Sequence, residues 1–328
     1  MRRPGAGHIR AQPDTAPADR GGSMTNHRIS LWGAPGSGKT TFLAALSIAM
    51  MRNKLDWALV PKDDASGDRL ASLTAQLVRE REFPKVTNQL EVLDYVLLGP
   101  PRVRRRGWFF RRATVTEPAH VDLSIVDLPG GAFGSSPTSD LIDDLAASHG
   151  LLFLFDPIRE FESGDSFDYF YGVLSRLAQR VMASDASSAR LPHRLAVCIT
   201  KFDDPRVLGT AERLNLIATD PDDSHQGPRV TSDGAEELFR SLCTVSASGN
   251  ADMLLSGIRQ FFRPERVRFF ATSAIGFYID QRRHAYDSDD FQNVIPMNEG
   301  HRIRGSVHPI NVLEPILWLA DQPATDVK

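Results

Sequence analysis

With 328 residues, 41% of them hydrophobic, the chain has the composition of a globular protein that forms one large domain or two small ones. Its formal net charge of -3 argues against a polycation that binds nucleic acid over its whole surface. Two cysteines argue against a disulfide framework, and no apolar run approaches the roughly 20 residues that span a bilayer, so we expect a cytoplasmic protein without a transmembrane segment.

The two ends of the chain are expected to be tails. Residues 1–26 lack the apolar segment of a signal peptide and have the composition of a disordered segment. Met24 competes with Met1 as the start of the protein. Residues 321–328 are expected to form a short C-terminal tail.

Strand and helix patterns alternate along the rest of the chain. The predicted strands are 28–32, 89–98, 121–127, 151–155, 195–199 and 267–271, and the second of them is expected to end at Gly99-Pro100-Pro101. The predicted helices are 41–52, 64–81 (ended by Pro84), 167–182, 234–242, 252–262 and 311–320. This alternation predicts an α/β fold with a doubly wound, mostly parallel sheet and helices on both faces. We expect one domain over 27–320, with insertions at about 53–118 and 204–265.

The first predicted strand runs into Gly33-Ala34-Pro35-Gly36-Ser37-Gly38-Lys39-Thr40, and a helix follows from Thr41. The segment matches G-x-x-x-x-G-K-[ST] in full, in the strand-to-helix context of a P-loop. The glycines let backbone N–H groups face phosphate oxygens, and the helix N-terminus adds its positive dipole end. Lys39 would reach the β- and γ-phosphates, and Thr40 would ligate Mg²⁺. The predicted nucleotide-binding residues here are Gly33, Pro35, Gly36, Ser37, Gly38, Lys39, Thr40 and Thr41.

Two further motifs follow buried strands. Asp127-Leu128-Pro129-Gly130 places an aspartate that can hold Mg²⁺, and the N–H of Gly130 can face a γ-phosphate. Thr200-Lys201-Phe202-Asp203 places a carboxylate that can accept from two neighbouring donors of guanine, N1–H and N2–H₂. Adenine has no such pair on that edge and would leave the carboxylate unpaired. The stem of Lys201 would cover the base or the ribose. The alternative interpretation of Thr200–Asp203 is an ordinary loop without a role in binding.

After the last predicted strand, Thr272-Ser273-Ala274 can offer backbone N–H groups to the guanine O6, which adds Ser273 and Ala274 to the predicted site. In order, G-A-P-G-S-G-K-T, D-L-P-G, T-K-F-D and S-A resemble four boxes of Ras-like, TRAFAC-type P-loop GTPases over roughly 27–320. More narrowly, P-G-S-G-K-T-T-F-L-A-A-L, F-P-K-V-T, L-L-F-L-F-D-P and N-V-L-E-P-I-L-W-L resemble the bacterial double-GTPase group, regulators associated with conflict and signalling systems.

The resemblance implies a Mg²⁺-dependent switch that binds GTP and GDP, hydrolyses GTP slowly and is read by a protein partner, either an effector or an activating protein. It assigns Lys39, Thr87 and Gly130 to catalysis and Thr40, Thr87 and Asp127 to the metal. Thr114 and Thr116 compete with Thr87 for its role in switch I.

Gly131 stands where Ras-like enzymes often place the glutamine that orients water. Three alternatives to the regulatory GTPase stay open. One is a GTP-dependent scaffold with little hydrolysis, which Gly131 favours. Another is an ATP-using P-loop protein in which Asp203 has no role in recognising the base. The third is a membrane or nucleic-acid module built on the segment Arg102–Arg112.

The segment Arg102–Arg112 holds six arginines and three aromatic residues. We expect a surface that contacts anionic lipid, RNA or an acidic protein. A solvated hairpin tip and an arginine finger acting in cis are the alternatives. His149 and Cys198 are expected to be packing residues, and no His/Cys pattern predicts a zinc site.

Overall fold

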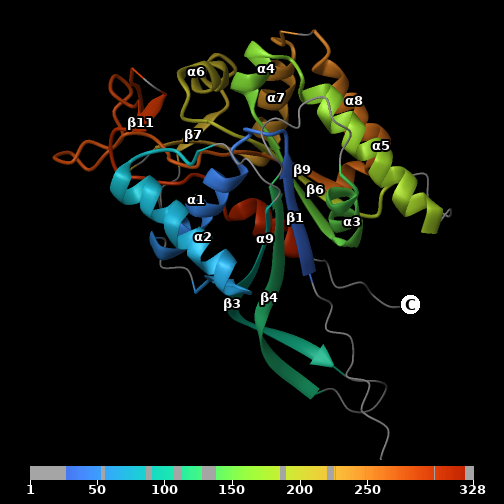
Figure 1. Ribbon diagram of the computed structural model, residues 1–328. Coiled ribbons are helices and arrows are strands. Elements are labelled where there is room, and N and C mark those ends of the chain that lie inside the picture. The colour runs from blue at the N-terminus through green and yellow to red at the C-terminus, as the bar shows by residue number, and fades with distance from the viewer. Residues whose placement is uncertain are drawn as a thin grey trace, which may run out of the picture.

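The chain folds around one large sheet (Figure 1). The computed structural model describes residues 27–52, 56–85, 91–106, 113–127, 138–184, 190–219, 225, 227–247, 249–298 and 300–321. Within these residues, no helix combines the length and the apolar character that crossing a membrane requires.

The sheet has seven strands in the order β2-β3-β4-β1-β5-β6-β9. Their bounds are β1 His27–Gly33, β2 Ala58–Pro61, β3 Glu91–Arg106, β4 Ala113–Asp127, β5 Gly150–Phe155, β6 Arg194–Ile199 and β9 Val267–Ala271. Neighbours from β4 to β9 are parallel. At the other edge, β3 runs antiparallel to both of its neighbours, β2 and β4. The predicted α/β fold with a mostly parallel sheet is therefore confirmed.

The apolar run of β5 shows how the sequence builds this sheet. Successive side chains of a strand point to opposite faces. Phe153 and Phe155 accordingly join one buried cluster, and Leu152 and Leu154 join a second one on the other face. A strand with both faces covered reads as continuous apolar sequence, which is the pattern that predicted it.

Helices supply the outer layers on both faces of the sheet (Figure 1). One cluster of core residues includes side chains from α1 (Lys39–Arg52), α2 (Asp64–Ala75, continued by a π-helical turn over Gln76–Glu80) and α9 (Glu314–Ala320). The other includes side chains from α3 (Ser139–Ala147), α4 (Pro157–Glu162), α5 (Ser166–Ser184), α6 (Pro205–Arg213), α7 (Ser232–Cys243) and α8 (Asp252–Phe261).

Short elements complete the described part of the chain. They are the hairpins β7 (Ile217–Thr219) with β8 (Pro228–Val230) and β10 (Val294–Pro296) with β11 (His301–Ile303), and a 3₁₀ turn over Pro264–Arg266. None of them, nor β2, α3, α4 and α6, is among the predicted elements.

Several predicted bounds are wrong. β3 does not end before Gly99 but passes through a register shift between Gly99 and Pro101 and stays paired with β4 as far as Arg106. A bulge tolerates proline because it removes ladder hydrogen bonds locally. The distal part of β3 and β4 projects beyond the rest of the sheet (Figure 1). At the C-terminus the helix starts at Glu314, after a turn, instead of at Asn311.

The two predicted packing residues differ in their outcome. Cys198 is fully buried in the core, as predicted. His149 is exposed at the amino end of β5, so its prediction as a packing residue is wrong.

Candidate functional site

The P-loop turns sharply out of the sheet at the end of β1. Gly36 and Gly38 have φ angles of +78° and +92°, a region that L side chains rarely adopt. A Cβ on Gly33 would lie 2.8 Å from the carbonyl oxygen of Leu154 in β5 and 2.6 Å from the Ser37 hydroxyl. Glycine at these positions therefore lets the loop close tightly against the neighbouring strand before α1 begins at Lys39.

Lys39 and Ser37 lie buried inside the loop. The Lys39 ammonium donates to the carbonyl oxygens of Gly33 at 3.2 Å and Ala34 at 3.4 Å. The Ser37 hydroxyl is buried and finds no hydrogen-bond partner among the described residues. A buried hydroxyl without a partner costs free energy unless a ligand supplies one. A phosphate oxygen supplies the missing acceptor, so these residues fit a phosphate group.

The T-K-F-D segment is fixed to the carboxyl ends of three strands. The Thr200 hydroxyl donates to the carbonyl oxygen of Phe155 at 3.0 Å. The backbone N–H of Phe202 donates to the carbonyl oxygen of Thr272 at 3.0 Å, and the Phe202 ring is fully buried. Lys201 between them has a left-handed φ of +57°. These anchors leave the Lys201 and Asp203 side chains at the cavity described below.

Asp203 is a buried carboxylate that is only 7% exposed. The Ser273 hydroxyl donates to its Oδ1 at 2.5 Å, and the same hydroxyl accepts from the N–H of Gly276 at 2.7 Å. Burial raises the pKa of Asp203 to about 6, although the Ser273 hydrogen bond acts in the opposite direction. A ligand with two N–H donors would relieve the cost of keeping this carboxylate ionised.

Asp156 is a residue of the site that sequence reasoning did not single out. Its Oδ2 lies 2.7 Å from the Lys201 ammonium. Its Oδ1 accepts from the backbone N–H groups of Ile158 at 3.0 Å and Arg159 at 3.2 Å, so it caps α4. The sequence signal is an aspartate that directly precedes a proline at the start of a helix. Asp156 joins the loop after β5 to the loop after β6.

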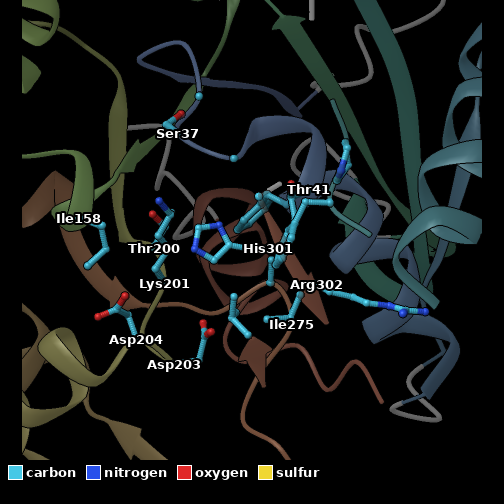
Figure 2. Close-up of a pocket in the computed structure, with 18 of the residues that line it drawn as sticks. Ser37, Thr41, Ile158, Thr200, Lys201, Asp203, Asp204, Ile275, His301 and Arg302 are labelled. Atoms are coloured by element: carbon cyan, nitrogen blue, oxygen red, sulfur yellow. The ribbon is translucent and has the colours of Figure 1, made fainter. Parts of the chain in front are cut away.

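The P-loop, the T-K-F-D segment and the loop after β9 meet at one cavity of about 1200 Å³ (Figure 2). Residues 36–42 of the P-loop and α1 line it, together with Thr200, Lys201, Asp203, Thr272 and Ala274. Ser273 lies behind this surface through its hydrogen bond to Asp203. The structure thus brings residues of the first, third and fourth motifs together at the carboxyl ends of parallel strands, where ligands of such sheets bind, although Gly33 and Pro35 of the first motif do not line the cavity.

Two further segments line the cavity. Phe83, Pro84 and Lys85 belong to the F-P-K-V-T stretch that precedes and includes Thr87. The β10–β11 hairpin, which contributes Val294, Pro296, Met297, His301 and Arg302, was not indicated by the sequence. The strands of this hairpin are three residues long, too short to show a period in the sequence.

The remaining predicted residues are placed only in part. Thr87, Gly130 and Gly131 lie outside the described residues. The backbone of Asp127 ends β4, which neighbours β1, the strand that leads into the P-loop. Thr114 and Thr116 lie more than ten residues before Asp127 on the same strand, roughly 35 Å or more from its end. Both threonines therefore lie far along β4 from the end that neighbours the P-loop strand.

No protein-family model and no curated protein matches this chain. It is similar to a chain of the signal recognition particle receptor SRb-GTP/SRX complex from Chaetomium thermophilum, with 14% identity and a TM-score of 0.36 over 77% of this chain and 93% of that one. It is also similar to the S. cerevisiae Ski7 GTPase-like domain bound to GTP, with 12% identity and a TM-score of 0.34 over 76% of this chain and 43% of that one. Similarity at this level does not transfer a function to this chain.

Proposed function

We propose that this protein binds GTP and GDP with Mg²⁺ and hydrolyses GTP slowly, as a regulatory switch over one domain, 27–320. The observation that carries the proposal is that the P-loop and the buried carboxylate of Asp203 belong to one cavity. A P-loop alone is common to proteins that use ATP and to proteins that use GTP. The carboxylate adds the selectivity for the base.

The phosphates would lie in the P-loop. Its backbone N–H groups and the N-terminus of α1 favour negative charge, and the Ser37 hydroxyl gains a partner. Lys39 would exchange its contacts with loop carbonyls for phosphate oxygens and stabilise the charge that develops during hydrolysis. When bound, Mg²⁺ neutralises charge on the β- and γ-phosphates, and Thr40, Thr87 and Asp127 are the residues that would hold it.

The base would lie between the loops after β6 and β9. Asp203 would accept from both donors of the guanine edge, while Ser273 keeps the carboxylate oriented. The backbone of Ala274 would face the guanine O6, and the stem of Lys201 would cover the ring. Adenine would give the buried, ionised carboxylate no donor from the ligand, which is costly.

Hydrolysis is expected to be slow without a partner. Gly131 carries no side chain that could orient the attacking water, and the N–H of Gly130 and the hydroxyl of Thr87 are the remaining contacts to the γ-phosphate that we propose. Unassisted turnover on the order of 10⁻⁴–10⁻² s⁻¹ follows for such a site. An effector or activating protein would then read or shorten the GTP state, in keeping with the resemblance to bacterial double-GTPases.

Competition between nucleotides tests the proposal. Asp203→Asn replaces an acceptor by a donor and should weaken GTP binding roughly ten- to hundredfold, while xanthosine triphosphate, with a carbonyl at position 2, should gain relative affinity. Asp63→Asn is the matched control, because asparagine also caps helices, Asp63 caps α2 and it does not line the cavity. Equal affinity of the wild-type protein for ATP and GTP would refute guanine selectivity.

A GTP-dependent scaffold is the second candidate, and Gly131 is the observation that favours it. Both candidates bind GTP, so binding does not separate them. Single-turnover release of phosphate does, because a scaffold retains GTP intact over the time in which the switch hydrolyses it.

A further inference from the structure

The β10–β11 hairpin forms a wall of the cavity that comes from neither the P-loop nor the T-K-F-D segment. His301 begins β11, is exposed and lines the cavity. Figure 2 shows its imidazole ring in the opening, with Thr41 of α1 on one side and Thr200 with Lys201 on the other in that view. His301 therefore lines the same cavity as the phosphate loop and the loop that holds Asp203.

One end of this hairpin is fixed to the loop after β9. Asn293, which is 1% exposed, precedes β10. Its amide nitrogen donates to the carbonyl oxygens of Ile275 at 3.3 Å and Ser306 at 3.1 Å, and its amide oxygen accepts from the N–H of Gly305 at 2.8 Å. A buried amide with three hydrogen bonds has little freedom. The hairpin is thus joined to the loop that is proposed to face the base.

The other end is fixed to the segment that follows α2. The N–H of Ile303 donates to the carbonyl oxygen of Arg81 at 2.9 Å, and the Arg81 guanidinium donates to the carbonyl oxygen of Arg304 at 3.0 Å. Glu82 and Arg302 form an antiparallel bridge. With supports on two sides, the backbone that carries His301 is held in place before any ligand arrives.

The phosphates and the base of a bound nucleotide already have proposed protein partners, whereas the ribose does not. The P-loop supplies the partners for the phosphates, and Asp203 with Ala274 supplies those for the edge of the base. The ribose lies between these two parts and presents two vicinal hydroxyls, each of which donates and accepts. A neutral imidazole has one donor and one acceptor nitrogen, so its chemistry matches a hydroxyl pair.

We propose that His301 is a nucleotide-contacting residue that hydrogen-bonds the ribose hydroxyls, and that the β10–β11 hairpin positions it for this contact. The proposal rests on the proposed function, because it assumes that the cavity holds a ribonucleotide. It adds a contact outside the four motifs and predicts that the protein distinguishes ribose from a sugar without hydroxyls.

The test compares GTP with 2′,3′-dideoxy-GTP, which lacks both hydroxyls, by calorimetric titration of the full chain. The wild-type protein should bind the dideoxy nucleotide about 3- to 10-fold more weakly, the effect of about one net hydrogen bond. His301→Ala should lower the affinity for GTP by a similar factor and bring the ratio of the two affinities close to one. His301→Gln, which keeps a donor and an acceptor, should restore part of the preference.

His149→Ala is the matched control, since His149 is an exposed histidine at the amino end of β5, away from the cavity. It should leave both affinities unchanged. The proposal is overturned if His301→Ala binds GTP as the wild-type protein does, or if it keeps the wild-type preference for GTP over the dideoxy nucleotide. Failure of the proposed function looks different, because the wild-type protein itself would then not prefer GTP to ATP.

Discussion

Lys201 and Asp156 form an ion pair between the loops after two neighbouring strands, with 2.7 Å between the ammonium and a carboxylate oxygen. Asp156 is 3% exposed, and its other oxygen caps α4. One side chain therefore holds a helix start and a residue of the candidate site at once. Its two roles can be separated by substitution.

Asp156→Ala should remove both roles, and Asp156→Asn should remove only the charge. Loss of an N-cap costs about 0.5–2 kcal/mol, so the alanine variant should unfold at a lower urea concentration. The asparagine variant should stay closer to the wild type in stability, since asparagine caps helices as well as aspartate. Both should bind GTP more weakly, because Lys201 loses the partner that orients it. Equal stability of the two variants would contradict the capping role.

Asp203 should make the nucleotide-free protein less stable as the pH rises. Burial raises its pKa from 3.8 to about 6, so the folded state holds this proton more tightly than the unfolded state. The resulting stabilisation is fully present below about pH 3.8 and is lost as the pH rises through about 6. The difference corresponds to about 3 kcal/mol, an order-of-magnitude figure.

Asp203→Asn should consequently stabilise the nucleotide-free protein at pH 8, by up to about 3 kcal/mol, while it weakens GTP binding. Urea unfolding at pH 5 and pH 8 measures the first effect, and the gain should be smaller at pH 5. GTP affinity of the wild-type protein should rise between pH 5 and pH 7 as the carboxylate ionises, and this rise should be absent in the variant. A variant no more stable than the wild type at pH 8 would show that burial of the carboxylate carries no cost.

The sequence predicted those parts of the site that depend on local patterns. The P-loop is a defined sequence motif. Asp203 and Ser273 follow apolar strand runs, so their meeting at one edge of a parallel sheet follows from topology. Asp156 also directly follows an apolar run, but its pairing with Lys201 depends on side-chain conformations that no local sequence pattern specifies. His301 was not predictable either, since its position depends on the side-chain amide of Asn293 and on contacts with Arg81.

Gly33 should not tolerate even a methyl group. The Cβ of an alanine would lie 2.8 Å from the carbonyl oxygen of Leu154, which the β5 ladders hold in place, so the P-loop has to move instead. Gly33→Ala should cost about 1–3 kcal/mol of stability and weaken nucleotide binding. Gly172→Ala in α5 is the control: a Cβ there meets nothing within 4 Å, and the variant should be more stable by about 0.5–1 kcal/mol. Urea unfolding of both variants measures the change in stability. A Gly33 variant as stable as the wild type would show that the loop can move without a cost in stability.

Thr87 stays our prediction for the residue that encloses the γ-phosphate, and the distance of Thr114 and Thr116 from the P-loop end of β4 supports it. Thr87→Ala should leave GDP affinity nearly intact, because GDP lacks the phosphate in question. It should lower the rate of GTP hydrolysis, measured as phosphate release in a single turnover. Equal rates for the variant and the wild type would mean that another residue encloses the γ-phosphate.

The arginines of the β3–β4 hairpin should act far from the nucleotide. In the strand register, Arg104, Arg105 and Arg106 pair with Val115, Thr114 and Ala113, whereas Glu91 pairs with Asp127 at the P-loop end. These arginines lie thirteen or more positions along the strand from Glu91, which corresponds to roughly 40 Å, so the backbone register is incompatible with an arginine finger acting in cis.

Replacing Arg104, Arg105 and Arg106 together by alanine should therefore leave GTP turnover within a few-fold of the wild type. If the segment contacts an anionic partner surface, as its composition suggests, the same variant should bind anionic vesicles, RNA or an acidic protein more weakly, and the wild-type binding should fall as salt is added. Turnover and binding are measured separately on the same preparations. A collapse of turnover with unchanged binding would return these arginines to the active site, against the register. Unchanged turnover with unchanged binding would mean that Arg104, Arg105 and Arg106 are solvated and contact no partner.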